Sequence, residues 1–144
     1  MKNVLKLLFL ALIVLSGCGK PATESAASAD SLRLAGKALY GRAMDIHDEV
    51  MPKMDELYRL KQNLKDTLAS PAAFPAEVKA DFESRIHLID SAEQSMMDWM
   101  HDNRLRPAQD TTNLEVYQQY MKEKVEAAEK MKALMLEAIA KGKI

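Results

Sequence analysis

Methionine and histidine side chains, which can bind soft metal ions or make adaptable contacts, gather in two short windows of the sequence. The first window is residues 44–54 and the second is residues 96–102. Six of the ten methionines fall in these windows, and each window holds one histidine, His47 or His101. Thioether and imidazole donors together suit Cu(I), whereas methionine alone suits core packing and protein contacts. The elements that position the windows decide between these uses.

Three helices are predicted, because apolar residues recur at helical spacing from residue 31 onward and no strand-like alternation appears. The first helix is expected to begin near Asp30 or Ser31. Pro52 lies within it and should kink or briefly break it, since proline lacks an N–H and clashes with the preceding turn. The expected apolar stripe of this helix is Leu39, Ala43, Ile46, Val50, Leu57, Leu64 and Leu68.

Proline and a capping motif bound the other two helices. Pro75 stands near the start of the second helix, which is expected to stop between residues 103 and 106, before Pro107. Residues 112–115, Thr-Asn-Leu-Glu, fit a capping box at the start of the third helix, which ends at Gly142. The expected stripes are Val78, Phe82, Ile86, Ile89, Glu93, Met96 and Met100, then Leu114, Tyr117, Met121, Val125, Ala128, Met131, Met135 and Ile139.

The expected fold class is therefore all-α: an antiparallel, up-down-up three-helix bundle whose first helix is kinked near Pro52. An extended coiled coil is the other helical arrangement, but the two breaks marked by proline favour a chain that folds back. Many stripe positions hold alanine or methionine and aromatic residues are few, so the core is thin. Such a narrow bundle could gain stability by pairing with a second copy.

Folding back brings the two windows to one height of the bundle. With the first turn near residue 72, His47 lies level with Met97, within about one helical turn. A second turn near residue 107 brings residues 113–120 alongside, which include Tyr117 and Tyr120. On the first helix, helical angles place a stripe on the flank, formed by Met44, His47 and Met51. On the second, they place Met96 and Met100 inward, Met97 and His101 at the boundary, and His87 in solvent.

Three interpretations of the windows stay open. The default is packing, with methionines filling gaps in the core and the histidines satisfied or solvated. The second is an adaptable surface for a second copy or a partner protein, formed by Met44, Met51, Met97 and Trp99. The third is a Cu(I) or haem site with the ligands His47, Met51, Met97 and His101, although their expected directions diverge.

Enzymatic chemistry is not expected. The sequence has no nucleophile with a spaced base, no glycine-rich phosphate loop and no His-Glu-x-x-His motif. Glu93 is the one carboxylate on a core stripe, and Arg42, Lys53 or a boundary histidine is its expected partner. The carboxylates near the windows are expected to be solvated rather than ligands of a hard metal ion: Asp45, Asp48, Glu49, Asp98 and Asp102.

The start of the chain predicts a signal peptide at residues 1–17. A basic head precedes an apolar run that is about half of the ~20 residues a membrane-spanning helix needs. Residues 15–18, Leu-Ser-Gly-Cys, resemble the lipobox of bacterial lipoproteins at all four positions. The resemblance implies cleavage before Cys18 and attachment of lipid to its thiol, and two or more acyl chains anchor stably. Cys18 is the only cysteine, so neither a disulfide nor a cysteine metal site is expected.

The expected organisation is a signal peptide at 1–17, a lipidated cysteine with a flexible tether at 18–30, and a helical domain at 31–144. Gly19 follows the cysteine where an aspartate would signal inner-membrane retention, which favours the outer membrane. The tether lacks the dense acidic run of surface-export signals, which favours the periplasmic face. Without the signal peptide the chain has 18 basic and 21 acidic residues and no basic block, which argues against nucleic acid as a partner.

Two runs of sequence resemble a group of small Bacteroidetes lipoproteins that often carry the name "viral A-type inclusion protein". They are residues 47–54, His-Asp-Glu-Val-Met-Pro-Lys-Met, and residues 96–101, Met-Met-Asp-Trp-Met-His. The resemblance extends from about Ala38 to Lys141, and it implies a cell-envelope location and a helical fold without catalytic residues. The leading hypothesis is a non-enzymatic envelope lipoprotein whose helical module binds itself or a protein partner. Copper or haem binding is the alternative.

Overall fold

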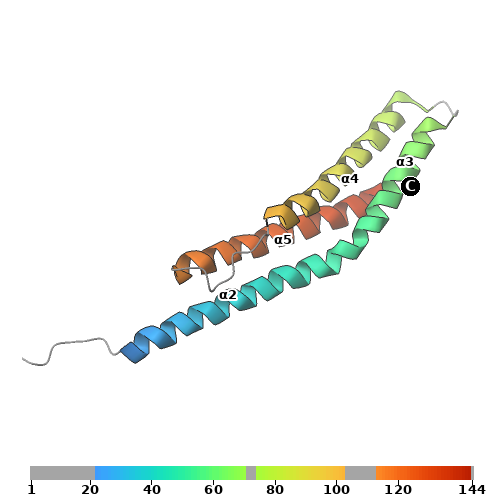
Figure 1. The fold of residues 1–144 in the computed structure, drawn as a ribbon. Helices are drawn as coiled ribbons and strands as arrows, with labels where there is room; N and C mark the ends of the chain where they lie inside the picture. The colour runs from blue at the N-terminus through green and yellow to red at the C-terminus, as the bar shows by residue number, and fades with distance from the viewer. Residues whose placement is uncertain (1–21, 71–73, 103–112, 144) are drawn as a thin grey trace, which may run out of the picture. The chain divides into compact units, whose positions relative to one another are not determined.

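The computed structural model describes residues 22–70, 74–102 and 113–143. Every regular element in these ranges is helical: α2 (Ala22–Val50), the 3₁₀ turn η1 (Met51–Lys53), α3 (Met54–Ala69), α4 (Ala76–Asp102) and α5 (Leu114–Gly142) (Figure 1). The all-α fold class is confirmed for the described ranges, with α2, η1 and α3 in the place of the first predicted helix. The predicted signal peptide, Cys18, the end of the second helix at 103–106 and Thr112 lie outside the described residues.

The segment around Pro52 forms the short 3₁₀ turn η1 rather than α-helix. Proline cannot donate an α-helical hydrogen bond, so the chain closes a tighter turn there. The backbone N–H of Met54 donates to the carbonyl of Met51, and α3 follows directly. An interruption therefore lies at the residue where the sequence predicts one.

Helix α2 begins at Ala22, which corrects the predicted start near Asp30 or Ser31. Residues 22–30 are helical in the structure, although the sequence analysis assigned them to a flexible tether. Alanine stands at 22, 26, 27 and 29. Alanine has the highest helix propensity, and no glycine or proline lies in this stretch to end a helix. Small and polar residues without periodicity therefore do not by themselves indicate an irregular chain.

The ends of α4 and α5 show how the predicted boundary signals act. The carbonyl of Pro75 accepts hydrogen bonds from the N–H groups of Val78 and Lys79, so α4 begins at the predicted proline. Helix α5 ends at Gly142 as predicted, but its cap is Asn113 rather than the first residue of the predicted box. The Asn113 side chain accepts from the N–H of Val116 at 3.1 Å. Asparagine is at least as good an N-cap as threonine, so the helix starts one residue later.

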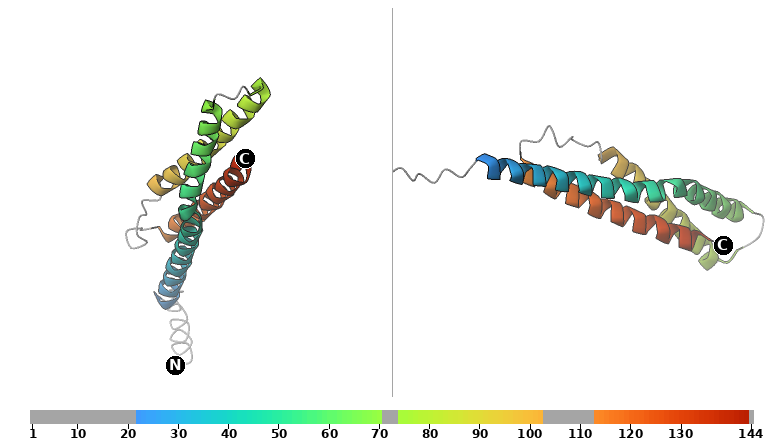
Figure 2. Two further views of the ribbon diagram at one scale, coloured as in Figure 1. Left: turned by 90° about the vertical axis from the view of Figure 1, so that its right-hand side faces the viewer. Right: turned by 90° about the horizontal axis from the view of Figure 1, so that it is seen from below.

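The helices pack within one compact unit, Leu32–Ile144, and the chain before it forms a separate unit that ends at Ser31. In the compact unit, α3, α4 and α5 lie side by side in pairs (Figure 2). Their buried apolar stripes largely follow the predicted ones. The core residues are Ala43, Val50, Leu57, Leu64, Phe82, Ile89, Ala92, Met96, Trp99, Tyr117, Met121, Val125, Ala128, Met131, Met135, Ala138 and Ile139.

One core position of α4 was predicted wrongly. Met100, expected to face inward, is 39% exposed, whereas Trp99 is only 6% exposed. Burying an indole removes more apolar area from water than burying a thioether chain does. The helix therefore presents Trp99 to the core, and Met100 lies at its margin.

Two glycines on α2 stand in very different surroundings. A Cβ added to Gly36 would overlap the ring of Tyr117 on α5, whose Cδ1 atom would lie 2.8 Å away. A Cβ added to Gly41 would meet nothing within 4 Å. The missing side chain of Gly36 thus lets the α2 backbone approach an aromatic ring, whereas nothing around Gly41 requires glycine.

Candidate functional site

The two methionine and histidine windows meet in the structure. The imidazole of His47 on α2 stacks on the indole of Trp99 on α4, with ring centroids 5.4 Å apart and 19° between the planes. The His47 side chain is only 13% exposed. The predicted neighbour of His47 was Met97, two residues from the observed contact and within the expected error of one turn. The prediction that the windows share one level is therefore confirmed.

The predicted position of α5 beside the windows is met by Tyr120 and not by Tyr117. The Tyr120 hydroxyl donates to the carbonyl of Asp102, the last residue of the second window, at 3.4 Å, whereas Tyr117 lies against Gly36. Lys124 is the residue beside Trp99, whose indole N–H donates to the Lys124 carbonyl at 3.2 Å. A connection of about ten residues leaves the register of the next helix free. Side-chain packing, rather than the position of the loop, sets that register.

Trp99 does not belong to a contact surface, which corrects one member of the predicted set. Its ring is buried. The indole N–H donates to the Lys124 carbonyl, and one face of the ring stacks on His47. A buried indole N–H needs an acceptor, and the carbonyl supplies it. Trp99 of α4 therefore contacts both α2 and α5 from a buried position, and these contacts hold the three helices together.

Lys124 is a buried cation that the sequence analysis missed. Its side chain is 8% exposed and forms an ion pair with Asp102 at the end of α4. Its ammonium also lies 5.0 Å from the centroid of the Tyr120 ring, in a cation–π contact. The available signal was its place between Met121 and Val125, where helical spacing leaves a long side chain at the border of the apolar stripe.

Exposed apolar side chains line the boundary between the first helical segment and α4. We call Met51, Tyr58, Met97 and Met100 the methionine edge; these side chains are 42%, 56%, 54% and 39% exposed. Met51 follows His47, which contacts α4, by one helical turn. Met97 and Met100 follow Glu93, which contacts α3, by one and two turns. The contacts of His47 with α4 and of Glu93 with α3 thus indicate that the methionine edge lies where the first helical segment faces α4.

The other predicted residues take different places. Met44 is half-buried and packs against the core. His101 and His87 are both exposed on α4, as expected for His87. The predicted ligand set therefore includes one half-buried histidine, His47, and one exposed histidine, His101. Within the described ranges, no group of three or more histidine, cysteine, aspartate or glutamate side chains is arranged to hold a metal ion.

Glu93 binds Lys61 of α3, which corrects the predicted partners Arg42, Lys53 and histidine. Lys61 also donates to Asp90 at 3.1 Å, and its side chain is 13% exposed. Burial lowers the pKa of Lys61, but hydrogen bonds to Glu93 and Asp90 and their charges outweigh this effect, so the pKa is raised. The ammonium is therefore held in its charged form on the α3–α4 boundary.

Three further ion pairs mark the boundary between the first helical segment and α5. Arg42 pairs with Glu129, Glu49 with Lys132 at 2.5 Å, and Glu56 with Lys143 at 3.7 Å. Each such exposed pair contributes about 0–1 kcal/mol. Ion pairs therefore lie on both boundaries of the first helical segment, with α5 through these three pairs and with α4 through Lys61.

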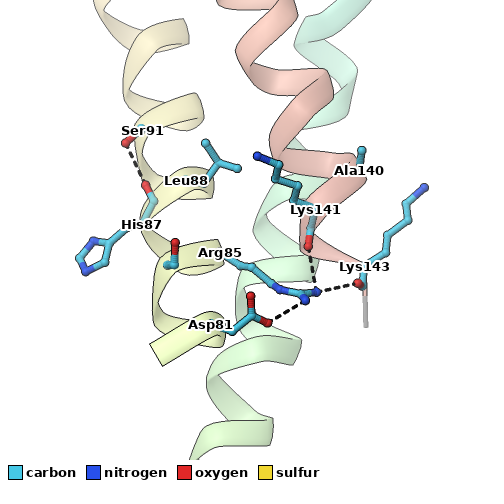
Figure 3. A pocket seen from close by; sticks show the side chains of 9 residues that line it. Asp81, Arg85, His87, Leu88, Ser91, Ala140, Lys141 and Lys143 are labelled. Carbon is cyan, nitrogen blue, oxygen red and sulfur yellow. Dashed lines mark hydrogen bonds and ion pairs between the residues drawn. The ribbon is translucent and has the colours of Figure 1, made fainter. Parts of the chain in front are cut away.

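A pocket of about 680 Å³ lies between α4 and the end of α5, and the sequence analysis did not foresee it (Figure 3). Arg85 in its lining donates to the carbonyls of Lys141 and Lys143 at 3.1 Å each. Arg85 also pairs with Asp81 at 2.7 Å. The guanidinium thus satisfies the last carbonyls of α5, which have no partner within the helix. This pocket is better explained by helix capping than by binding.

A second hollow, of about 540 Å³, lies between α4 and α5. Its walls are mainly apolar and include Trp99, Met131 and Leu134. No described helix is both long enough and apolar enough to cross a membrane. Comparisons with protein-family models, with curated proteins and with solved structures find no significant match to this chain.

Proposed function

We propose that this chain is a non-enzymatic lipoprotein of the bacterial cell envelope whose helical body binds a second copy of itself through the methionine edge. The observation that carries this proposal is that Met51 and Tyr58 on the first helical segment, and Met97 and Met100 on α4, are each 39% or more exposed. Flexible, polarizable methionine side chains make adaptable contact surfaces. A cluster of exposed apolar side chains commonly marks an interaction site.

We propose an up-down-up order of helices, with a kink near Pro52, as the frame that presents this edge. Early residues of the first segment contact late residues of α4, as in His47–Trp99, and Lys61 contacts Glu93. Opposite chain directions explain this pattern. In the pairs Glu49–Lys132 and Glu56–Lys143, the residue numbers increase together on the two segments. This pattern supports parallel directions for the first segment and α5.

The anchor in this proposal is lipid on Cys18. Its support is the sequence alone: a basic head, a short apolar run and the lipobox-like residues 15–18. The glycine after the cysteine and the absence of a dense acidic run support the periplasmic face of the outer membrane. Anchoring to a membrane raises the local concentration of the chain, so a contact of low affinity would be sufficient for two copies to associate.

The anchor is tested by the variant Cys18→Ala. We expect the unaltered chain in the membrane fraction and the variant lost from it, because no lipid can then hold the protein. Mass spectrometry of the mature chain should show an acylated amino-terminal cysteine. An unaltered chain that fractionates with soluble proteins, or that carries no lipid, would contradict the anchor.

Self-association is tested by sedimentation of a soluble fragment, residues 19–144. We expect a dimer whose dissociation constant rises about tenfold or more in Met51→Glu and in Met97→Glu, because each places a carboxylate in the apolar contact. Leu136→Glu is the matched control, since Leu136 is 40% exposed on α5, outside the edge. A strict monomer at high concentration would refute self-association, as would equal effects of all three variants.

A further inference from the structure

We propose that the apolar hollow between α4 and α5 binds one aliphatic chain that ends in a carboxylate, such as a fatty acid. The hollow has a volume of about 540 Å³ and is lined by four residues from each helix. Ligand sites in helix bundles commonly lie between helices, have volumes of about 300–1,000 Å³ and are mainly apolar with a few polar groups. No residue of the methionine edge lines the hollow, so the site depends neither on the dimer nor on the lipid anchor.

The apolar part of the hollow suits a flexible aliphatic chain. Trp99 and Met131 line it although they are only 6% and 3% exposed, so they form its base. Leu134, which is half-buried, and Ala127 add to this lining from α5. The lining extends over two turns of each helix, roughly 10 Å along the axis. A chain lying along the helices would bury methylene groups there, and each buried methylene raises the affinity up to about fourfold.

Three of the four polar side chains that line the hollow already have partners within the chain. The Ser95 hydroxyl donates to a backbone carbonyl of its own helix at 2.8 Å. The Asp98 carboxylate accepts from the Gln94 amide at 2.7 Å. Asp102 forms an ion pair with Lys124, which balances its charge. These three side chains therefore need no ligand to satisfy them.

Lys130 is the fourth polar side chain, and it sets the chemistry of the ligand. Within the described ranges its ammonium forms neither an ion pair nor a hydrogen bond. The lysine stem can lie along the apolar wall and present the ammonium at the rim. An ammonium offers three donors and a positive charge, so it pairs with an anionic head group. One ammonium balances the single charge of a carboxylate, whereas a phosphate monoester carries about −1.5 to −2.

Trp99 reports on binding, because it is the only tryptophan and it lines the hollow. The experiment uses the whole chain after the predicted signal peptide, residues 18–144, with Cys18→Ser, so that neither its own lipid nor a detergent competes with the probe. Sodium dodecanoate is titrated below its micelle concentration while Trp99 fluorescence is followed. We expect a saturable change at one molecule per chain, and an affinity about tenfold or more above that of octanoate, which has four fewer methylenes.

Variants test the head group and the chain of the ligand separately. Lys130→Gln should weaken dodecanoate binding about tenfold and leave dodecanol binding unchanged, whereas Lys122→Gln, exposed on the same helix outside the hollow, should change neither. Leu134→Glu should weaken both ligands about tenfold or more, whereas Leu136→Glu should weaken neither. Asp98→Asn should strengthen dodecanoate binding about two- to fivefold, because it removes a negative charge from the lining.

Three results would overturn the site. They are no saturable change with dodecanoate, equal affinity of the parent and Lys130→Gln for dodecanoate, and tighter binding of dodecyl phosphate than of dodecanoate. Because Lys130 is exposed, its variant keeps the test valid even if Leu134→Glu fails to fold. Met97→Glu, which tests the dimer, should bind dodecanoate like the parent, so failure of the dimer and failure of this site are distinguishable.

Discussion

Replacing Trp99 with alanine should lower the free energy of unfolding by about 3–5 kcal/mol, the range for removal of a large buried aromatic side chain. The indole is 6% exposed, stacks on His47 and donates to the Lys124 carbonyl. Its loss therefore removes packing between three helices and leaves that carbonyl without its partner. Small domains are stable by only about 5–15 kcal/mol, so this variant should be close to unfolding.

Urea denaturation followed by circular dichroism measures this effect without relying on the deleted fluorophore. Trp99→Phe should cost clearly less than the alanine variant, because it keeps the ring and loses only the indole hydrogen bond and some area. Met97→Ala, at an exposed position two residues away, should change stability by about 0.5 kcal/mol or less. Equal losses for Trp99→Ala and Met97→Ala would show that Trp99 is not part of the core.

The same glycine-to-alanine substitution should have opposite effects at two positions of α2. Gly36→Ala should destabilise the protein by about 1–3 kcal/mol, because its Cβ overlaps the Tyr117 ring and overpacking outweighs the gain in helix propensity. Gly41→Ala should stabilise it by about 0.5–1 kcal/mol, since nothing lies within 4 Å of the added Cβ.

Thermal and urea unfolding of the two single variants test this difference. The double variant Gly36→Ala/Tyr117→Ala separates overlap from other causes, because the added methyl group then no longer meets a ring. We expect Gly36→Ala to be less damaging in that background than in the unaltered chain. Stabilisation by Gly36→Ala in the unaltered chain would show that α2 does not approach Tyr117 closely.

Trp99 connects the stability of the fold to the candidate site. It holds the His47 ring on one face, and the exposed Met97 and Met100 flank it in sequence. The methionine edge therefore depends on a core residue that is itself only 6% exposed. A surface variant such as Met97→Leu is consequently a cleaner probe of binding than any substitution of Trp99.

Local signals in the sequence were sufficient to predict the helices and most of their ends. Proline at 75, the asparagine-containing cap before α5 and glycine at 142 act through local backbone chemistry, which needs no knowledge of the rest of the fold. The apolar stripes followed from helical periodicity, and the shared level of the two windows followed from one short turn. The early start of α2 is not predicted although its alanines are visible, because small and polar residues without helical periodicity are typical of a tether.

Packing between the helices selects which side chain at the margin of each stripe is buried and which partner it contacts, and local signals do not predict this. Trp99 rather than Met100 is buried, Glu93 meets Lys61, and Lys124 lies beside Trp99. These choices depend on the register and rotation of whole helices. Register is set by the sum of many contacts, including the close approach of Gly36 to Tyr117. Periodicity defines the face of a helix to within about one residue, and that last residue is fixed by what packs against it.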